Sequence, residues 1–133
     1  MPIQVSHIDN DSGVEILATG DIYGKDIIEI YPDIYNRNSL HKQRYHLIDR
    51  TGCDKYFVSV KDLKAISELD NAAANINPNI IVAIVSPTQV TRAAAEIWKT
   101  FIKESTFQTE LFDDRNSAIE WIEIQLGEKI QLT

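Results

Sequence analysis

The sequence contains a single cysteine, Cys53, among its 133 residues, so no disulfide can form within the chain. No apolar run approaches the roughly 18 residues that a membrane-spanning helix needs. The N-terminal residues also lack the basic start and apolar stretch of a secretory signal peptide. Together with the scarcity of cysteine, which is typical of reducing compartments, these absences predict a cytoplasmic protein that is not an integral membrane protein.

Basic residues are in the minority. Twenty acidic residues against thirteen basic ones give a formal net charge of −7. Because nucleic-acid binding depends on Lys and Arg to neutralise phosphates, we expect no nucleic-acid partner. Hydrophobic residues make up 44% and charged residues 25%, which is close to the globular average. The length is that of one domain, and with neither linker nor repeat we expect a single domain over residues 1–133.

Apolar periodicity predicts an alternation of strands and helices. Residues 3–8 and 14–18 alternate as strands around the turn signal Asn10-Asp11-Ser12-Gly13, which predicts an antiparallel hairpin. A helix should begin at Gly24 and be ended or kinked by Pro32, because proline lacks the backbone donor; a polar loop should follow at 36–43. Further strands are expected at 44–50, 80–85 and 107–112, and further helices at 59–75, 88–103 and 114–126, with Asp114 as an N-cap.

The resulting order, ββαβαβαβα, predicts an α/β fold. Strands that alternate with helices form a mostly parallel sheet with helices on its faces, and only the first strand should run antiparallel. In such sheets, ligands bind beyond the carboxyl ends of the strands. The polar residues that we expect at that edge, and therefore our ligand candidates, are Asp49, Arg50, Thr51, Ser86, Thr88 and Arg92.

Catalytic and cofactor motifs are missing from this edge. The sequence has neither a GxGxxG nor a GxxxxGK[ST] phosphate-binding loop, and no GxSxG nucleophile elbow. His46 and Cys53 show no zinc-ligand spacing, and His46 is expected to be packed or hydrogen-bonded inside a strand. We therefore nominate no catalytic residue, no metal ligand and no cofactor. One enzymatic alternative remains, in which Asp21 and Asp49 hold a magnesium ion.

A second candidate site is apolar. Small residues surround Trp98 in the helix expected at 88–103, and Ala94 lies one turn before it. Such small residues either permit close helix packing or leave a crevice for an apolar ligand. Ala94 and Trp98 are our candidates for that crevice.

The stretches RYHLIDRTGCDKYFVSVKDLKAI, AIVSPTQVTRAAAEIWKTF and ELFDDRNSAIEWI, in this order of elements, resemble STAS-like (SpoIIAA-like) bacterial domains related to the sporulation anti-anti-sigma factor. The similarity runs from the first hairpin to Trp121. It implies a STAS-like fold and a non-enzymatic regulatory or sensing domain that acts by binding a protein partner. In the switch proteins of that group, a serine at the start of the second helix is phosphorylated, and Ser59 occupies the corresponding place.

Ser59 has two interpretations. The resemblance makes it a phosphoacceptor candidate, although the residues around it, Val58-Ser59-Val60-Lys61, differ from the Asp-Ser-Ser/Thr-Gly of the switch proteins. The spacing Ser59-x-x-Asp62 is that of a capping box, in which each side chain accepts a hydrogen bond from the other residue's amide. We interpret Ser59 first as a helix cap.

Three functions remain open. The first is regulation through protein–protein interaction. The alternative is binding of a small apolar ligand or lipid, with peripheral membrane association. A metal-dependent enzyme is third. The first strand should lie at the sheet edge, where it could pair with a second copy and form a homodimer.

Overall fold

The computed structural model of the protein describes residues 2–36, 38–103 and 106–132. Its strands are β1 (Ile3–Ile8), β2 (Gly13–Tyr23), β3 (Tyr45–Phe57), β4 (Ile81–Val85) and β5 (Gln108–Phe112). Its helices are α1 (Gly24–Glu29), α2 (Tyr31–Ile34), the short 3-10 helix η1 (Leu40–Lys42), α3 (Val60–Ile76), α4 (Gln89–Phe101) and α5 (Arg115–Leu126). None of the helices in these ranges has both the length and the apolar character needed to cross a membrane.

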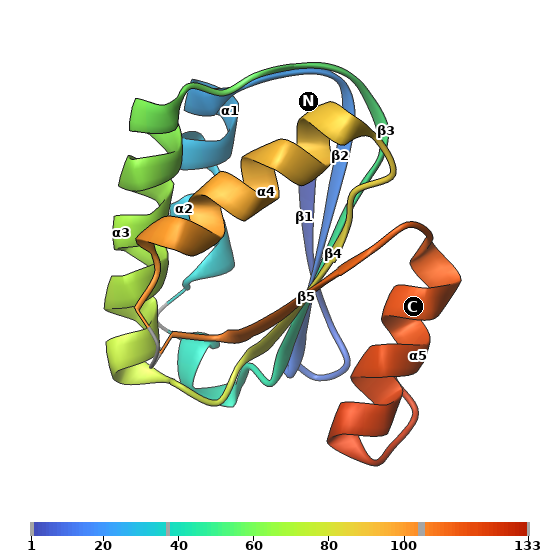
Figure 1. The fold of residues 1–133 in the computed structure, drawn as a ribbon. Coiled ribbons are helices and arrows are strands. Elements are labelled where there is room, and N and C mark those ends of the chain that lie inside the picture. The colour runs from blue at the N-terminus through green and yellow to red at the C-terminus, as the bar shows by residue number, and fades with distance from the viewer. Residues whose placement is uncertain (1, 37, 104–105, 133) are drawn as a thin grey trace.

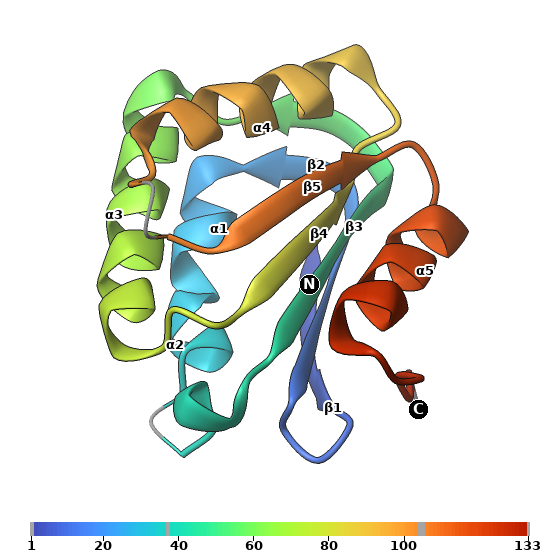
Figure 2. The same ribbon diagram turned by 60° about the horizontal axis from the view of Figure 1, so that its bottom comes forward.

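The strands form one sheet in the order β1-β2-β3-β4-β5. β1 pairs antiparallel with β2, and the other neighbours pair in parallel, which confirms the predicted topology. β1 lies at a sheet edge, as predicted, while its pairing with a second copy stays a prediction. Helices α1 to α4 cover one face of the sheet and α5 covers the other (Figures 1 and 2).

Strands β2 and β3 are longer than predicted. We expected them to end at Ala18 and Arg50, but they continue side by side to Tyr23 and Phe57. Two register shifts interrupt the pairing, between Leu17 and Thr19 and between Gly20 and Ile22, and Gly20 has a φ of 70°. These irregularities break the alternation from which strands are recognised, so both strands were predicted to end too early.

The first predicted helix is divided into α1 and α2, which meet at Ile30. Pro32 lies in the first turn of α2, where its missing N–H costs nothing. The predicted loop 36–43 was only partly correct, because it contains η1. Asp114 caps α5, as predicted, by accepting from the amide of Ser117 at 2.8 Å.

The alternation along β3 and β4 divides the interior between the two faces. Val82 and Ile84 of β4 pack under the helices α3 and α4, whereas Ala83 and Val85 pack against α5. In β3, the same alternation places His46, Ile48 and Arg50 on the α1–α4 side, and Leu47 and Asp49 on the α5 side.

Candidate functional site

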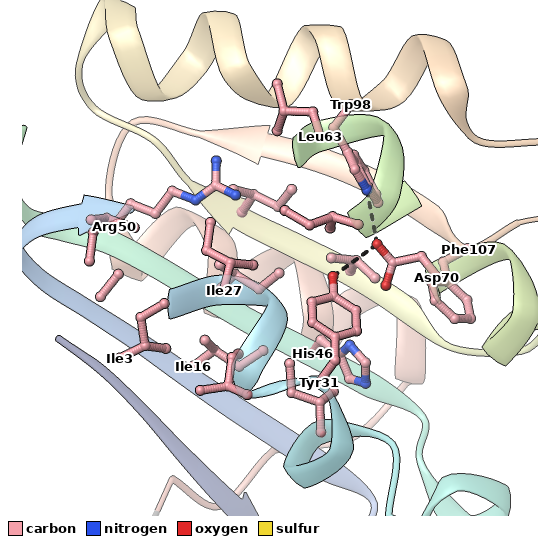
Figure 3. A pocket seen from close by; sticks show the side chains of 18 of the residues that line it. Ile3, Ile16, Ile27, Tyr31, His46, Arg50, Leu63, Asp70, Trp98 and Phe107 are labelled. Carbon is pink, nitrogen blue, oxygen red and sulfur yellow. Dashed lines mark hydrogen bonds between the residues drawn. The ribbon is translucent and has the colours of Figure 1, made fainter. Parts of the chain in front are cut away.

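An interior cavity of about 70 Å³ lies between the sheet and helices α1 to α4 (Figure 3). Its wall is largely apolar. It is formed by residues of all four helices and of strands β1 to β4. Among the strand residues that line it are Ile3, Ile16, Ala18, Ile22, Ile48 and Ile84, and among the helix residues are Ile27, Leu63, Ile66 and Trp98. An apolar interior with a few placed polar groups is typical of small-molecule sites.

Asp70 is the acidic group of this cavity and is 4% exposed. Its Oδ2 accepts hydrogen bonds from Tyr31 Oη at 3.0 Å and from Trp98 Nε1 at 2.9 Å, and its Oδ1 accepts from Tyr35 Oη at 2.6 Å. The Tyr31 and Trp98 bonds are drawn in Figure 3. Asp70 therefore connects α2, α3 and α4 by hydrogen bonds in the cavity wall.

Burial governs the protonation of this cluster. It raises the pKa of Asp70 to about 6, although the hydrogen bonds from Tyr35, Trp98 and Tyr31 act in the opposite direction. Burial and the neighbouring Asp70 charge raise the pKa of both tyrosines well above its ordinary value, so both phenols stay protonated donors. At neutral pH, the Asp70 carboxylate therefore accepts hydrogen bonds from Tyr31, Tyr35 and Trp98.

His46 lies in the same interior, buried and hydrogen-bonded as predicted. Its Nε2 lies 2.8 Å from Gln43 Oε1. The side-chain amide of Gln43 in turn donates to Ile34 O at 2.7 Å. Its backbone carbonyl accepts from Asn77 Nδ2 at 2.9 Å. Burial lowers the pKa of His46 to about 3, so the imidazole is neutral and serves as a fixed part of the wall.

Arg50 and Tyr56 form the other polar part of the lining. The guanidinium carbon of Arg50 lies 5.3 Å from the centroid of the Tyr56 ring, a cation–π distance. Arg50 Nη1 also donates to Thr91 O at 3.4 Å, a long hydrogen bond. The Tyr56 hydroxyl is buried and has no hydrogen-bond partner in the part of the chain that the structure describes.

Asp49, although adjacent to Arg50, points to the opposite face of the sheet. There Arg115 of α5 donates to Asp49 Oδ2 at 3.0 Å and also pairs with Glu15. Thr51 donates to Asp49 Oδ1 from its amide at 2.9 Å and from its hydroxyl at 2.5 Å. Burial acts to raise the pKa of Asp49, but these hydrogen bonds outweigh it and hold the pKa below its usual value.

The six edge candidates therefore do not form one site. Thr88 caps α4 by accepting from the amide of Thr91 at 3.2 Å, and Arg92 pairs with Asp113 at the surface. Ser86 is fully buried, and its hydroxyl has no partner within the described ranges. Of the six, Arg50 alone lines the cavity.

The magnesium alternative brought together Asp21 and Asp49. The strand register pairs Asp49 with Leu17, four residues before Asp21, so the two aspartates lie about 13 Å apart along the strands. Both carboxylate oxygens of Asp49 are also occupied by Thr51 and Arg115. Within residues 2–36, 38–103 and 106–132, no group of three or more His, Cys, Asp and Glu side chains could hold a metal ion.

The two crevice candidates lie in different surroundings. Trp98 lines the cavity, whereas Ala94 is packed in the core without reaching it. The cavity lies under α1, α2 and α3 rather than along the alanines of α4. Asp70, Tyr31 and Tyr56 were not among the site residues expected from the sequence. Asp70 left a signal, because it follows Leu63 and Ile66 at helical spacing on the buried stripe of α3.

Ser59 forms the predicted capping box. Its Oγ accepts from the amide of Asp62 at 3.1 Å, and Asp62 Oδ2 accepts from the amide of Ser59 at 3.0 Å. Val60, which follows the cap, is 56% exposed, because α3 buries the face that contains Leu63. Phosphorylation of Ser59 stays a prediction.

We expect Ser59→Ala to lower the free energy of unfolding by about 1 kcal/mol, since it removes the acceptor for the Asp62 amide. Ser59→Asp is the matched control, because it retains a capping oxygen and places a negative charge at the helix N-terminus. Urea unfolding of the three proteins gives the comparison. Equal losses for alanine and aspartate would show that the cap does not stabilise α3.

No family model and no curated protein matches the chain. One solved structure that it resembles is an uncharacterized protein of the DUF3478 family, with a SpoIIAA-like fold, from Shewanella loihica PV-4. The two share 18% sequence identity over 90% of this chain and 91% of that one, with a TM-score of 0.53. At this identity the likeness concerns the fold alone. The ordering of strands and helices together with this match establishes that the chain has a SpoIIAA-like, STAS-type α/β fold.

Proposed function

We propose that this protein is a non-enzymatic sensing domain that binds a small, largely apolar molecule in the cavity between the sheet and α1–α4. The observation that carries the proposal is the cavity itself, about 70 Å³ of space inside a wall of isoleucine, leucine and tryptophan side chains. Protein interiors are normally close-packed, with few voids larger than a water molecule. Apolar cavities stay dry and accept apolar ligands.

The covering helices suit a binding role. α1 has six residues and α2 has four, so neither is long enough to be stable without packing. Their contribution to the cavity wall includes Ile27 and Tyr31, and Tyr31 is held by Asp70 on α3. Occupation of the cavity would change the packing of α1 and α2, which connects ligand binding to the outer surface of the domain.

Native mass spectrometry of the freshly purified protein, compared with its denatured mass, tests this function. We expect an additional small mass that disappears on denaturation and a melting temperature that rises on addition of 1-butanol. Ala18→Leu is the control, because it places a larger side chain in the cavity wall and should abolish both effects. A wild-type protein without bound mass and without a response to 1-butanol would contradict the proposal.

Regulation through a protein partner is a second candidate, favoured by an exposed apolar surface next to Ser59. Tyr23 and Phe57 stack at the ends of β2 and β3 with ring centroids 5.0 Å apart, and they are 45% and 49% exposed. Val60 follows at the start of α3. Exposed aromatic groups of this kind are typical of protein-binding surfaces.

Phe57→Ser tests this second function. A protein that binds the wild type specifically should be lost from Phe57→Ser and retained by Val90→Ser, which removes a similarly exposed apolar side chain from α4. If both variants retain the same partners, the Tyr23–Phe57 surface does not act in binding.

A further inference from the structure

The polar groups of the cavity fall into two classes. Asp70 receives three donors, and His46 is held by Gln43, so both are already engaged. Arg50 and Tyr56 differ in this respect. In the described residues, the Arg50 guanidinium forms no ion pair with an acidic side chain, and the Tyr56 hydroxyl has no hydrogen-bond acceptor.

The Tyr56 hydroxyl carries a free-energy cost in the structure as it stands. A buried hydroxyl without a partner loses its hydrogen bonds to water and gains none in return. Buried polar groups are nearly always satisfied in folded proteins, so such an exception calls for an explanation. Tyr56 lines the cavity, and a ligand atom that accepts its hydrogen bond would supply the missing partner.

Arg50 also lacks a partner, because its positive charge forms no ion pair in the described residues. Its side chain is half-buried, with the guanidinium over the Tyr56 ring and a 3.4 Å contact to Thr91 O as its hydrogen bond. The guanidinium fork is shaped to bind a carboxylate through two parallel hydrogen bonds. Because the fork lies over the ring of Tyr56, one anionic group can meet both residues.

We propose that the ligand of the cavity is a short-chain carboxylic acid, whose carboxylate binds to Arg50 and Tyr56 and whose apolar tail lies among the isoleucines. This inference rests on the proposed function and names the chemical class of its ligand. Figure 3 shows Arg50 and Asp70 toward opposite ends of the lining, with Ile27 and Leu63 between them. The carboxylate is thereby kept at the arginine end, away from the Asp70 charge.

The volume limits the length of the tail. The cavity of about 70 Å³ is roughly half the size of an engineered cavity of about 150 Å³ that holds benzene. A tail of a few methylene groups fits a cavity of this volume, and each methylene group that moves from water into the cavity adds to the affinity. The tails of long-chain fatty acids are too large for it.

Titrations of butanoate and 1-butanol, followed by NMR at pH 7, test the inference, because the two probes have equal chains and differ in the charged group. We expect the wild type to bind butanoate at least about tenfold more tightly than 1-butanol. Arg50→Met should remove this preference. Arg92→Gln, which removes an arginine that pairs at the surface with Asp113, should retain it.

Tyr56→Phe provides a second readout that a structural role would not give. It removes a hydroxyl without a partner, so the melting temperature of the unliganded protein should stay the same or rise. Butanoate affinity should nevertheless fall about fivefold, and 1-butanol affinity should change less.

The outcomes separate this inference from the proposed function. If butanoate and 1-butanol bind equally to the wild type, or if Arg50→Met keeps the preference, the carboxylate assignment is wrong while the cavity remains a ligand site. If neither probe binds, both the assignment and the proposed function are wrong. Loss of the butanoate preference in both Arg50→Met and Tyr56→Phe, but not in Arg92→Gln, supports the proposal.

Discussion

Replacing Asp70 with alanine is expected to lower the free energy of unfolding by about 3–5 kcal/mol. The substitution leaves three buried donors, on Tyr31, Tyr35 and Trp98, without their acceptor. Each such donor costs about 1–3 kcal/mol when its partner is removed. Urea denaturation at pH 7 measures the loss. A change below about 1 kcal/mol would mean that Asp70 does not hold α2, α3 and α4 together.

Asp70→Asn adds a pH test of the same cluster. Burial raises the pKa of Asp70 from 3.8 to about 6. A carboxyl whose pKa is raised by folding contributes stability below its unfolded pKa and loses it as the pH rises through the folded value. Between pH 4 and 7, the wild type should therefore lose about 2 kcal/mol relative to Asp70→Asn.

The groups that face Asp70 do not interfere with this comparison. Tyr31 and Tyr35 have a raised pKa and stay neutral, and Trp98 does not titrate. His46 has a folded pKa of about 3, and its contribution is common to both proteins. Parallel stability profiles for the wild type and Asp70→Asn would contradict a raised pKa at Asp70.

Replacing Arg115 with methionine is expected to cost about 3–5 kcal/mol at pH 7. Glu15 and Asp49 are 9% and 8% exposed, and Arg115 is the cation that pairs with both. Removing one partner from a buried ion pair leaves an uncompensated charge, which is far more costly than losing a surface pair. The loss should diminish as the pH falls, because Arg115 holds the pKa of Asp49 low and protonation neutralises Asp49 once the arginine is removed.

Arg44→Met is the matched control for Arg115→Met. Arg44 pairs with Glu128 at the surface, where both side chains are about half exposed, so its removal should cost less than about 1 kcal/mol. Guanidinium or urea unfolding at pH 7 and pH 4 separates the two. Similar losses for both variants, or a loss for Arg115→Met that does not depend on pH, would argue against a buried network.

Much of the fold could be predicted from periodicity. Local patterns were sufficient for the continuous apolar strand β4, the apolar stripe of α3 and the helix caps Ser59 and Asp114. Each of these depends on residues that are close together in the sequence. The extension of β3 from Thr51 to Phe57 could not be read in this way. Its side chains are mostly exposed, and polar residues follow one another without the alternation of a half-buried strand.

The candidate site was less predictable, because it depends on contacts between distant parts of the chain. Asp70 lies 39 residues from Tyr31 and 28 from Trp98, and Arg115 lies 100 residues from Glu15. Asp70 on an apolar stripe could have been noticed. The volume of the cavity could not, since it is set by how α1 and α2 pack on the sheet rather than by any one residue.

Methyl-resolved NMR of the protein with 1-butanol tests most directly whether the interior cavity is a ligand site. We expect intermolecular nuclear Overhauser effects between the butanol chain and the methyl groups of Ile16, Ile48 and Ile84, and between the chain and the Trp98 indole, all of which line the cavity. Effects confined to exposed side chains such as Ile76 and Ile124, or no effects at all, would contradict a ligand-binding cavity.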